Sequence, residues 1–369
     1  MDENEVYNEE VRTTLFRLDG KPTLDSFFNK DGLLLRTYGW LVKNAVGIIV
    51  LIHGLKSHAR LTYLNNNVEI ISNDKAILID GNNYYIYRDS WIECFNKNKY
   101  SVYAIDLQGH GQSDGWQNLP ANVNEFDDLV YDVIQYMNKI RDETSSLSCS
   151  MDSITSDNGQ INCQKDIPIY LIGHSMGGNI ALRTLQILGK TEDESIKKLN
   201  IKGCVSLSGM ISYDKISRPG TSLFKFFYLP VTRIISAFIP TIRVVSEVNY
   251  TSFPFIIDLG NFDKFRLKKG VTCRFVYQLL RAMDNLDKDM ENIPKDIPIL
   301  FIHARDDCVC CYNGVESFYN RLNVNNKELY TLENMDHVIT REPGNENVLK
   351  KVVEWLSDLP EEEEADALN

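Results

Sequence analysis

The feature that most constrains this chain is a glycine-rich turn between an apolar run and an amphipathic stretch. The apolar run covers residues 167–172, and residues 179–188 carry apolar side chains at helical spacing. Between them lies Gly173-His174-Ser175-Met176-Gly177-Gly178. A strand that turns so sharply into a helix brings neighbouring backbone segments very close, and glycines at positions 173 and 177 avoid the collision. The pattern predicts a serine lifted clear of a sheet, beside the N–H groups of a helix N-terminus.

Such a turn is typical of a nucleophile elbow, and the rest of the chain should then supply an acid and a histidine in that order. The chain has six histidines, and His337 alone follows both Ser175 and an acid at a strand end. His337 is therefore the predicted base. Asp306 and Asp307 both follow the apolar run 297–303, and spacing alone barely separates them as the acid.

Two backbone N–H groups are predicted to form an oxyanion hole. The apolar run Val46–Ile52 ends at His53-Gly54, and a strand end upstream of the elbow is where this arrangement places one donor, here the N–H of Leu55. The second donor is the N–H of Met176, directly after the serine. Asp106 also follows a buried strand, but it precedes Ser175, so a structural role in its loop is expected.

Alternating strand and helix patterns predict an α/β fold with a mostly parallel central sheet flanked by helices. The chain divides into a polar lead-in at residues 1–30, a core at 31–209 and 291–358, a helical cap at 210–290 and an acidic tail at 359–369. Within the core, residues 62–87 are expected to be an insertion with a short hairpin. A predicted helix at 123–141 is followed by a polar insertion at 142–165, expected to be loosely ordered.

The cap contains many phenylalanines and should cover the carboxyl edge of the sheet, where ligands bind in open α/β folds. Its stretch from Phe224 to Val245 combines aromatic side chains with Lys225, Arg233 and Arg243. We expect this stretch to touch lipid surfaces transiently. A buried pair of cap helices is the alternative interpretation.

The composition of the chain argues against nucleic-acid binding, secretion, a membrane span and a metal site. The net charge of −12 argues against a nucleic-acid partner. The acidic N-terminus is no secretory signal, and no apolar stretch is long enough to span a bilayer. Eight cysteines without such a signal suggest reduced thiols and a cytoplasmic protein. Cys308-Val309-Cys310-Cys311 lacks a second ligand pair at metal-binding spacing, so no metal is expected. The chemistry of a serine, a histidine and an acid needs no cofactor.

Three motifs together resemble the monoglyceride lipase and lysophospholipase group of α/β-hydrolases: His53–His58, Asp106–Gly115 and Gly173–Gly178. The resemblance covers residues 30–60 and 88–358 apart from the insertions and a diverged cap. In that group the acid lies three residues after a glycine at the strand end, and with His303 in the glycine's place the resemblance implies Asp306. It also implies His337 as the base, and Leu55 and Met176 as oxyanion donors.

The expected function is a serine carboxylic-ester hydrolase that acts on monoacylglycerol, lysophospholipid or related small esters through an acyl-enzyme. A peptidase or amidase of the same fold is the alternative. It would need a pocket for a charged amino terminus, and the cap shows no clear carboxylate cluster to form one. A ligand-binding protein without catalysis would predict a broken triad, whereas every member has a plausible residue here.

Overall fold

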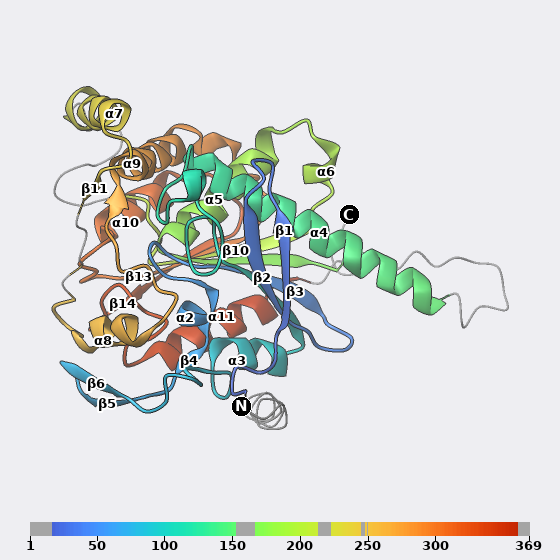
Figure 1. Ribbon diagram of the computed structural model, residues 1–369. Helices are drawn as coiled ribbons and strands as arrows, with labels where there is room; N and C mark the ends of the chain where they lie inside the picture. Colours follow the sequence, from blue (N-terminus) through green and yellow to red (C-terminus); the bar gives the residue numbers. More distant parts are fainter. Residues whose placement is uncertain (1–16, 153–166, 213–222, 245–247, 249, 361–369) are drawn as a thin grey trace.

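The computed structural model describes residues 17–152, 167–212, 223–244, 248 and 250–360. Most of the predicted lead-in and tail, and the end of the polar insertion, lie outside these residues. Within them, one eight-stranded sheet forms the centre of the molecule, in the order β1-β2-β8-β3-β9-β10-β13-β14 (Figure 1). Its strands are β1 (Thr23–Phe28), β2 (Leu34–Trp40), β3 (Gly47–Ile52), β8 (Tyr100–Ile105), β9 (Ile169–His174), β10 (Ile201–Leu207), β13 (Ile299–Ala304) and β14 (Lys327–Leu332).

The six strands from β8 to β14 in this order run parallel, and β1 and β2 add an antiparallel edge. The architecture is therefore an α/β fold with a mostly parallel central sheet, as the sequence predicted. Every residue of β3, β8, β9 and β13 is buried, because helices cover both faces of the sheet.

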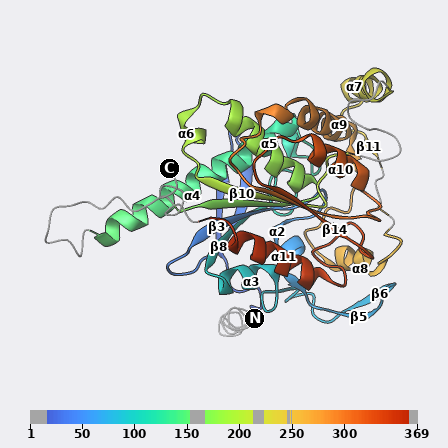
Figure 2. The same cartoon turned by 180° about the vertical axis from the view of Figure 1, so that it is seen from behind.

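Two helical layers form two hydrophobic cores, one on each face of the sheet. Successive residues of β3 alternate between them: Ile48 and Val50 belong to one core, Ile49 and Leu51 to the other. The first core includes α4 (Phe126–Asp152), α5 (Met176–Lys190), α9 (Cys273–Lys288) and α10 (Tyr312–Arg321). The second includes α2 (Ala59–Tyr63), α3 (Trp91–Lys97) and α11 (Asn345–Ser357), which lie on the opposite side in Figure 2. The short α6 (Glu194–Lys197) packs with the first layer.

Helix α4 is longer than predicted. The expected helix ends at Arg141, but α4 continues to Asp152, into the segment expected to be loosely ordered. No glycine or proline occurs between residues 142 and 152, so the polar composition does not stop the helix. The remainder of that insertion, residues 153–165, lies outside the described residues.

The insertion at 62–87 contains a hairpin that packs against the cap. Strands β5 (Val68–Ser72) and β6 (Lys75–Leu78) pair antiparallel, and β4 (Asn65–Asn66) pairs with β7 (Tyr85–Ile86). Cap helix α8 (Phe255–Phe262) lies on β6, where the Ala76 N–H donates to Asp258 Oδ2 over 3.0 Å. The insertion therefore supports the part of the cap that lies over the serine.

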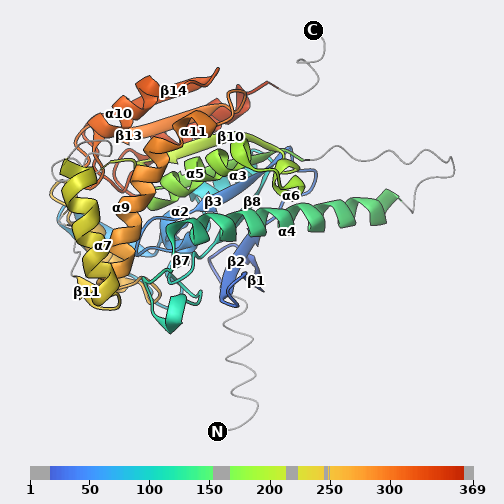
Figure 3. The ribbon, with the colours of Figure 1, turned by 90° about the horizontal axis from the view of Figure 1, so that it is seen from above.

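The outer part of the cap exposes its apolar side chains. A turn of π-helix, η2 (Phe224–Tyr228), leads into α7 (Leu229–Phe238), which packs beside α9 at the edge of the molecule (Figure 3). No residue of α7 is buried, so the alternative of a buried helix pair is wrong for this helix. A short strand pair follows, β11 (Arg243–Val244) with β12 (Val271–Thr272). No helix among the described residues is long and apolar enough to cross a bilayer.

Candidate active site

Ser175 occupies a strained turn between β9 and α5. Its backbone angles are φ 57° and ψ −118°, a conformation that non-glycine residues rarely adopt. A Cβ atom at Gly173 would lie 2.1 Å from the Gly177 carbonyl oxygen, and one at Gly177 would lie 2.2 Å from the Ile52 carbonyl oxygen. Both positions therefore require glycine, as the motif predicted. The Ser175 N–H donates to the Leu207 carbonyl over 2.8 Å, which ties the turn to β10.

His337 lies in the loop after β14 and faces the serine. Its Nε2 is 2.9 Å from Ser175 Oγ, and its Nδ1 is 2.9 Å from the nearer oxygen of Asp307. The loop is fixed from two sides. His174 Nε2 donates to the His337 carbonyl over 3.0 Å, and the Glu342 carboxylate accepts the N–H groups of Asp336 and Val338 over 2.6 and 2.7 Å.

The choice of Asp306 as the acid is wrong in position. Asp306 is exposed, whereas the neighbouring Asp307 places both carboxylate oxygens within 3.1 Å of His337 Nδ1. The end of the strand was predicted one residue too early. Strand β13 continues through Ala304, so the third residue after the strand is Asp307. The count that gave Asp306 began at His303, which is the penultimate residue of β13.

The cysteine-rich segment after the acid holds Asp307 through its backbone. The N–H groups of Val309 and Cys310 donate to Asp307 Oδ1 over 2.8 and 2.7 Å. The sequence gives His303 no role as the base, but its buried ring also contacts the Asp307 carboxylate. Its Nε2 lies 3.2 Å from Asp307 Oδ2 and 3.0 Å from the Cys310 carbonyl. Its place near the end of a buried strand, four residues before Asp307, is the sequence feature that could have indicated this contact.

The electrostatics of the pair suit proton transfer to His337. Burial alone would lower the pKa of His337, but the charge and hydrogen bond of Asp307 outweigh it and raise the pKa above its ordinary value. Burial likewise opposes ionisation of Asp307, and His337 with His303 hold the pKa of this carboxyl well below its usual range. Asp307 thus remains an anion, stabilises a protonated imidazole and fixes its tautomer.

The predicted oxyanion donors lie beside the serine. Met176 is the first residue of α5, where a helix leaves its N–H groups without intrahelical acceptors, and Leu55 lines the same cavity as Ser175. The Leu55 loop is held by His53, whose Nε2 accepts the Leu107 N–H over 3.0 Å and whose Nδ1 donates to the Gly54 carbonyl over 2.7 Å. A Cβ at Gly54 would lie 3.0 Å from that of Ser175, so the two loops meet at close contact.

Asp106 has the structural role expected of it. Its carboxylate accepts the N–H groups of Ala59 and Gln112 and the hydroxyl of Tyr38, each over 3.0 Å. These bonds join the loop after β8 to the start of α2, and His337 is not among the partners of Asp106.

A small cavity of about 100 Å³ opens beside Ser175. One part of its wall is apolar and comes from Leu61, Val338 and cap helix α8. The other part is polar and includes His337 and two arginines, Arg266 and Arg341. The residues that line it include no aspartate or glutamate.

Metal-binding geometry is not found among the described residues. No group of three or more His, Cys, Asp and Glu side chains in those ranges is arranged to hold an ion. None of the described cysteines Cys94, Cys204, Cys273, Cys308, Cys310 and Cys311 takes part in a disulfide.

Comparison with known proteins identifies the family of this chain. The family described as serine aminopeptidase, S33, matches residues 81–344, which is more than half of the chain. Monoglyceride lipase of Mus musculus is 27% identical, with 69% of this chain and 73% of the relative covered. Phospholipase YtpA of Bacillus subtilis is 22% identical, with 74% and 91% covered.

Solved structures show the same fold. A soluble variant of monoglyceride lipase from Saccharomyces cerevisiae, in complex with a substrate analogue, superposes with a TM-score of 0.67 at 18% identity, over 94% of this chain and 98% of that one. Monoacylglycerol lipase of Paleococcus ferrophilus gives 0.61 at 17% identity, over 88% and 99%. The elbow, the sheet order and the family match lead to one conclusion: the chain is an α/β-hydrolase and belongs to the serine aminopeptidase S33 family.

Proposed function

We propose that the protein is a serine carboxylic-ester hydrolase in which Ser175, His337 and Asp307 form the catalytic triad. The observation that carries the proposal is the chain of hydrogen-bond contacts from Ser175 Oγ through both nitrogens of His337 to Asp307. The backbone N–H groups of Leu55 and Met176 act as the oxyanion hole.

The reaction proceeds in two steps through an acyl-enzyme. His337 Nε2 accepts the hydroxyl proton as Ser175 Oγ attacks the ester carbonyl, and the two N–H groups stabilise the oxyanion. His337 then gives its proton to the departing alcohol. In the second step His337 takes a proton from the water that attacks the acyl-enzyme. It then gives this proton to Ser175 Oγ as the acid departs, which regenerates the enzyme.

Monoacylglycerols, lysophospholipids or related small esters are the proposed substrates. The names of the similar lipases and phospholipase support this class. The family's description raises the aminopeptidase alternative, in which a substrate ammonium group needs a carboxylate partner. The cavity lining offers arginines and no carboxylate, which favours the ester over the peptide.

A hydrolysis panel on the purified protein, with Ser175→Ala as the blank, tests the proposal. The panel holds a short-chain aryl ester, a long-chain monoacylglycerol, a lysophospholipid and an aminoacyl amide. Serine-dependent turnover of the esters is expected.

The cavity beside Ser175 has a volume of about 100 Å³, which is smaller than the about 300–1,000 Å³ typical of ligand pockets. A long acyl chain therefore requires the cap to move. Turnover of the amide alone would favour the peptidase.

The pH profile of hydrolysis should report His337. His337 accepts a proton only when neutral, so kcat/KM should rise with pH and reach half its maximum at the His337 pKa, above the ordinary 6.5. Burial also raises the pKa of the neighbouring Glu342 to about 7. Replacing Glu342 with glutamine removes the titration of this carboxyl group. The glutamine keeps one oxygen that can accept an N–H of the His337 loop. A rising limb that persists in Glu342→Gln belongs to His337; a flat profile from pH 5 to 8 would contradict its role as the base.

Contact between the cap and lipid surfaces is also part of the proposal. Phe226 and Phe238 are 80% and 82% exposed on the same outer segment of the cap, next to the apolar exposed face of α7. An exposed apolar patch of this kind marks an interaction surface, and bringing it to a bilayer would place the cap beside the substrate.

Replacing Phe226 and Phe238 with serine should weaken co-sedimentation with phosphatidylcholine vesicles several-fold. Phe28→Ser is the matched control, because Phe28 is 66% exposed on β1, away from α7 (Figure 3). Equal loss of binding in the control, or unchanged binding in a folded double variant, would remove the role of the cap in lipid contact.

A further inference from the structure

Two guanidinium groups line the cavity that contains Ser175. Arg266 follows cap helix α8, and Arg341 follows His337 by four residues. With no aspartate or glutamate in the lining, the wall of this cavity carries positive charge in a chain whose net charge is −12. The charge of this wall is opposite in sign to the net charge of the protein, so its function must be sought in the cavity itself.

Arg341 is held by neutral acceptors. Its Nε and Nη2 donate to the Leu61 carbonyl over 3.1 and 2.9 Å, and its Nη1 donates to Asn65 Oδ1 over 3.3 Å. Burial lowers the pKa of Arg341 to about 10, so the group remains charged at neutral pH. The ion pairs of the described residues include none between Arg341 and the adjacent Glu342, whose two carboxylate oxygens accept backbone N–H groups of the His337 loop.

Arg266 is placed against the cap by a glycine. A Cβ at Gly260 would lie 2.5 Å from Arg266 Nε, so the guanidinium packs closely on α8, and a side chain at residue 260 would displace it. Among the described residues, no carboxylate lies within ion-pair distance of either Arg266 or Arg341. Arg341, which burial desolvates, is a cation of the kind that an anion carried by a ligand stabilises.

Asn66 adds a third polar group to the same wall. Its Nδ2 and Oδ1 atoms are buried and have no hydrogen-bond partner in the described part of the chain, although Asn66 lines the cavity. Buried polar atoms are normally paired, so an amide left open at a cavity points to a ligand that completes its bonds.

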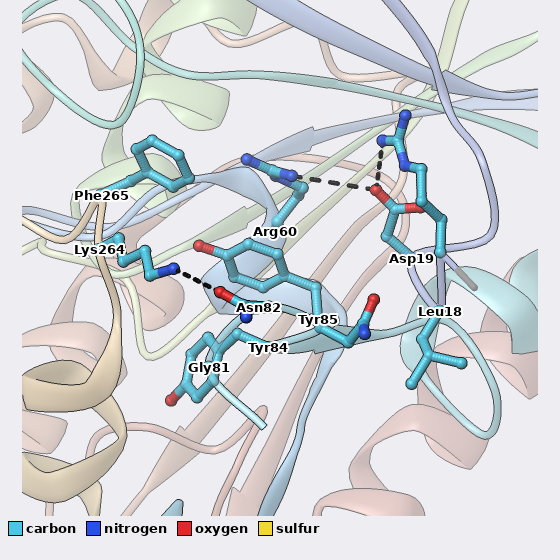
Figure 4. A pocket seen from close by; sticks show the side chains of 11 residues that line it. Leu18, Asp19, Arg60, Gly81, Asn82, Tyr84, Tyr85, Lys264 and Phe265 are labelled. Carbon is cyan, nitrogen blue, oxygen red and sulfur yellow. Dashed lines mark hydrogen bonds and ion pairs between the residues drawn. The ribbon is translucent and has the colours of Figure 1, made fainter. Parts of the chain in front are cut away.

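A second cavity, away from Ser175, has basic side chains in its wall whose charges are paired within the protein (Figure 4). It has a volume of about 240 Å³ and is lined by Arg17, Arg60 and Lys264. There Asp19 lies 2.6 Å from Arg17 and 4.0 Å from Arg60, and the Arg60 guanidinium also stacks 4.4 Å from the Tyr85 ring centre. Lys264 donates to Asn82. These arginines already have an anion, whereas Arg266 and Arg341 do not.

We propose that Arg266, Arg341 and Asn66 form a subsite for an acidic group carried by the ester substrate itself, a phosphate or a carboxylate. The proposal rests on the proposed ester hydrolysis and names its substrate class. Because Ser175, Arg266 and Arg341 line the same cavity, the acidic group lies within a few bonds of the scissile carbonyl. Planar guanidinium groups bind such oxyanions through paired hydrogen bonds.

Three short-chain substrates test the subsite without a lipid surface: butyryl glycerol, butyryl glycerol 3-phosphate and butyryl glycerate. The readout is the ratio of kcat/KM for each acidic ester to that for butyryl glycerol, which cancels losses of folded protein. A charged hydrogen bond of typical strength predicts that Arg266→Gln and Arg341→Gln each lower the preferred ratio about tenfold or more. Arg88→Gln, whose side chain is 87% exposed outside the cavity, is the matched control.

The outcomes separate the subsite from the proposed function. The acidic ester with the higher ratio identifies phosphate or carboxylate as the recognised group. Serine-dependent hydrolysis with ratios that neither arginine variant changes would overturn the subsite alone. Absence of hydrolysis in the wild type would overturn the proposed function. In that case titration calorimetry of glycerol 3-phosphate and glycerate into Ser175→Ala still decides: binding weakened about tenfold by Arg341→Gln supports the subsite, and no binding of either overturns it.

Discussion

Replacing Ser175 with alanine should reduce kcat for ester hydrolysis by about 10⁶-fold, because no acyl-enzyme can form without the hydroxyl. The residual rate reflects the oxyanion hole and substrate binding alone. The strained turn itself should survive, since alanine is smaller than serine and Gly173 and Gly177 still permit the close backbone approach. The measurement is steady-state turnover of a short aryl ester with purified protein.

Ser317→Ala controls for the substitution, because Ser317 is exposed on α10, far from the turn in sequence. Its activity should match the wild type. If Ser175→Ala, shown to be folded by circular dichroism, retained activity within about tenfold of the wild type, Ser175 would not be the nucleophile, given the effect expected of a triad serine.

Replacing Asp307 with asparagine should lower kcat about 10⁴-fold. An amide in place of the carboxylate stabilises the wrong imidazole tautomer and cannot stabilise the protonated ring. Asp306→Asn is a matched control, because it makes the same change one residue away at an exposed side chain. We expect the Asp306 variant to keep wild-type turnover. The reverse order of effects would restore Asp306 as the acid and contradict the geometry around His337.

The strained turn at Ser175 could be predicted because its signal is local. Collisions at Gly173 and Gly177 depend on the turn itself, so the sequence pattern alone identifies the strained serine. The choice between Asp306 and Asp307 depended on where β13 ends, and the end of a strand is difficult to predict to within one residue. The apolar run to His303 did not reveal that Ala304 still pairs with Leu332 of β14.

Contacts between distant segments could not be predicted in the same way. The apolar runs predicted a mostly parallel sheet, but the hairpin's support of α8 depends on tertiary packing. Likewise Arg266 comes from the cap and Arg341 from the His337 loop, and only the fold brings both to the Ser175 cavity. Neither residue belongs to a motif whose spacing indicates its neighbour.

The measurement that tests the central claim most directly is mass spectrometry after reaction with a fluorophosphonate. The reagent phosphonylates a serine only when a base activates it and donors stabilise the resulting tetrahedral group. We predict one label per molecule, on the peptide that carries Ser175, with loss of ester hydrolysis in proportion to labelling. Labelling of a different residue, or an unmodified Ser175 in a protein that still hydrolyses esters, would contradict the account.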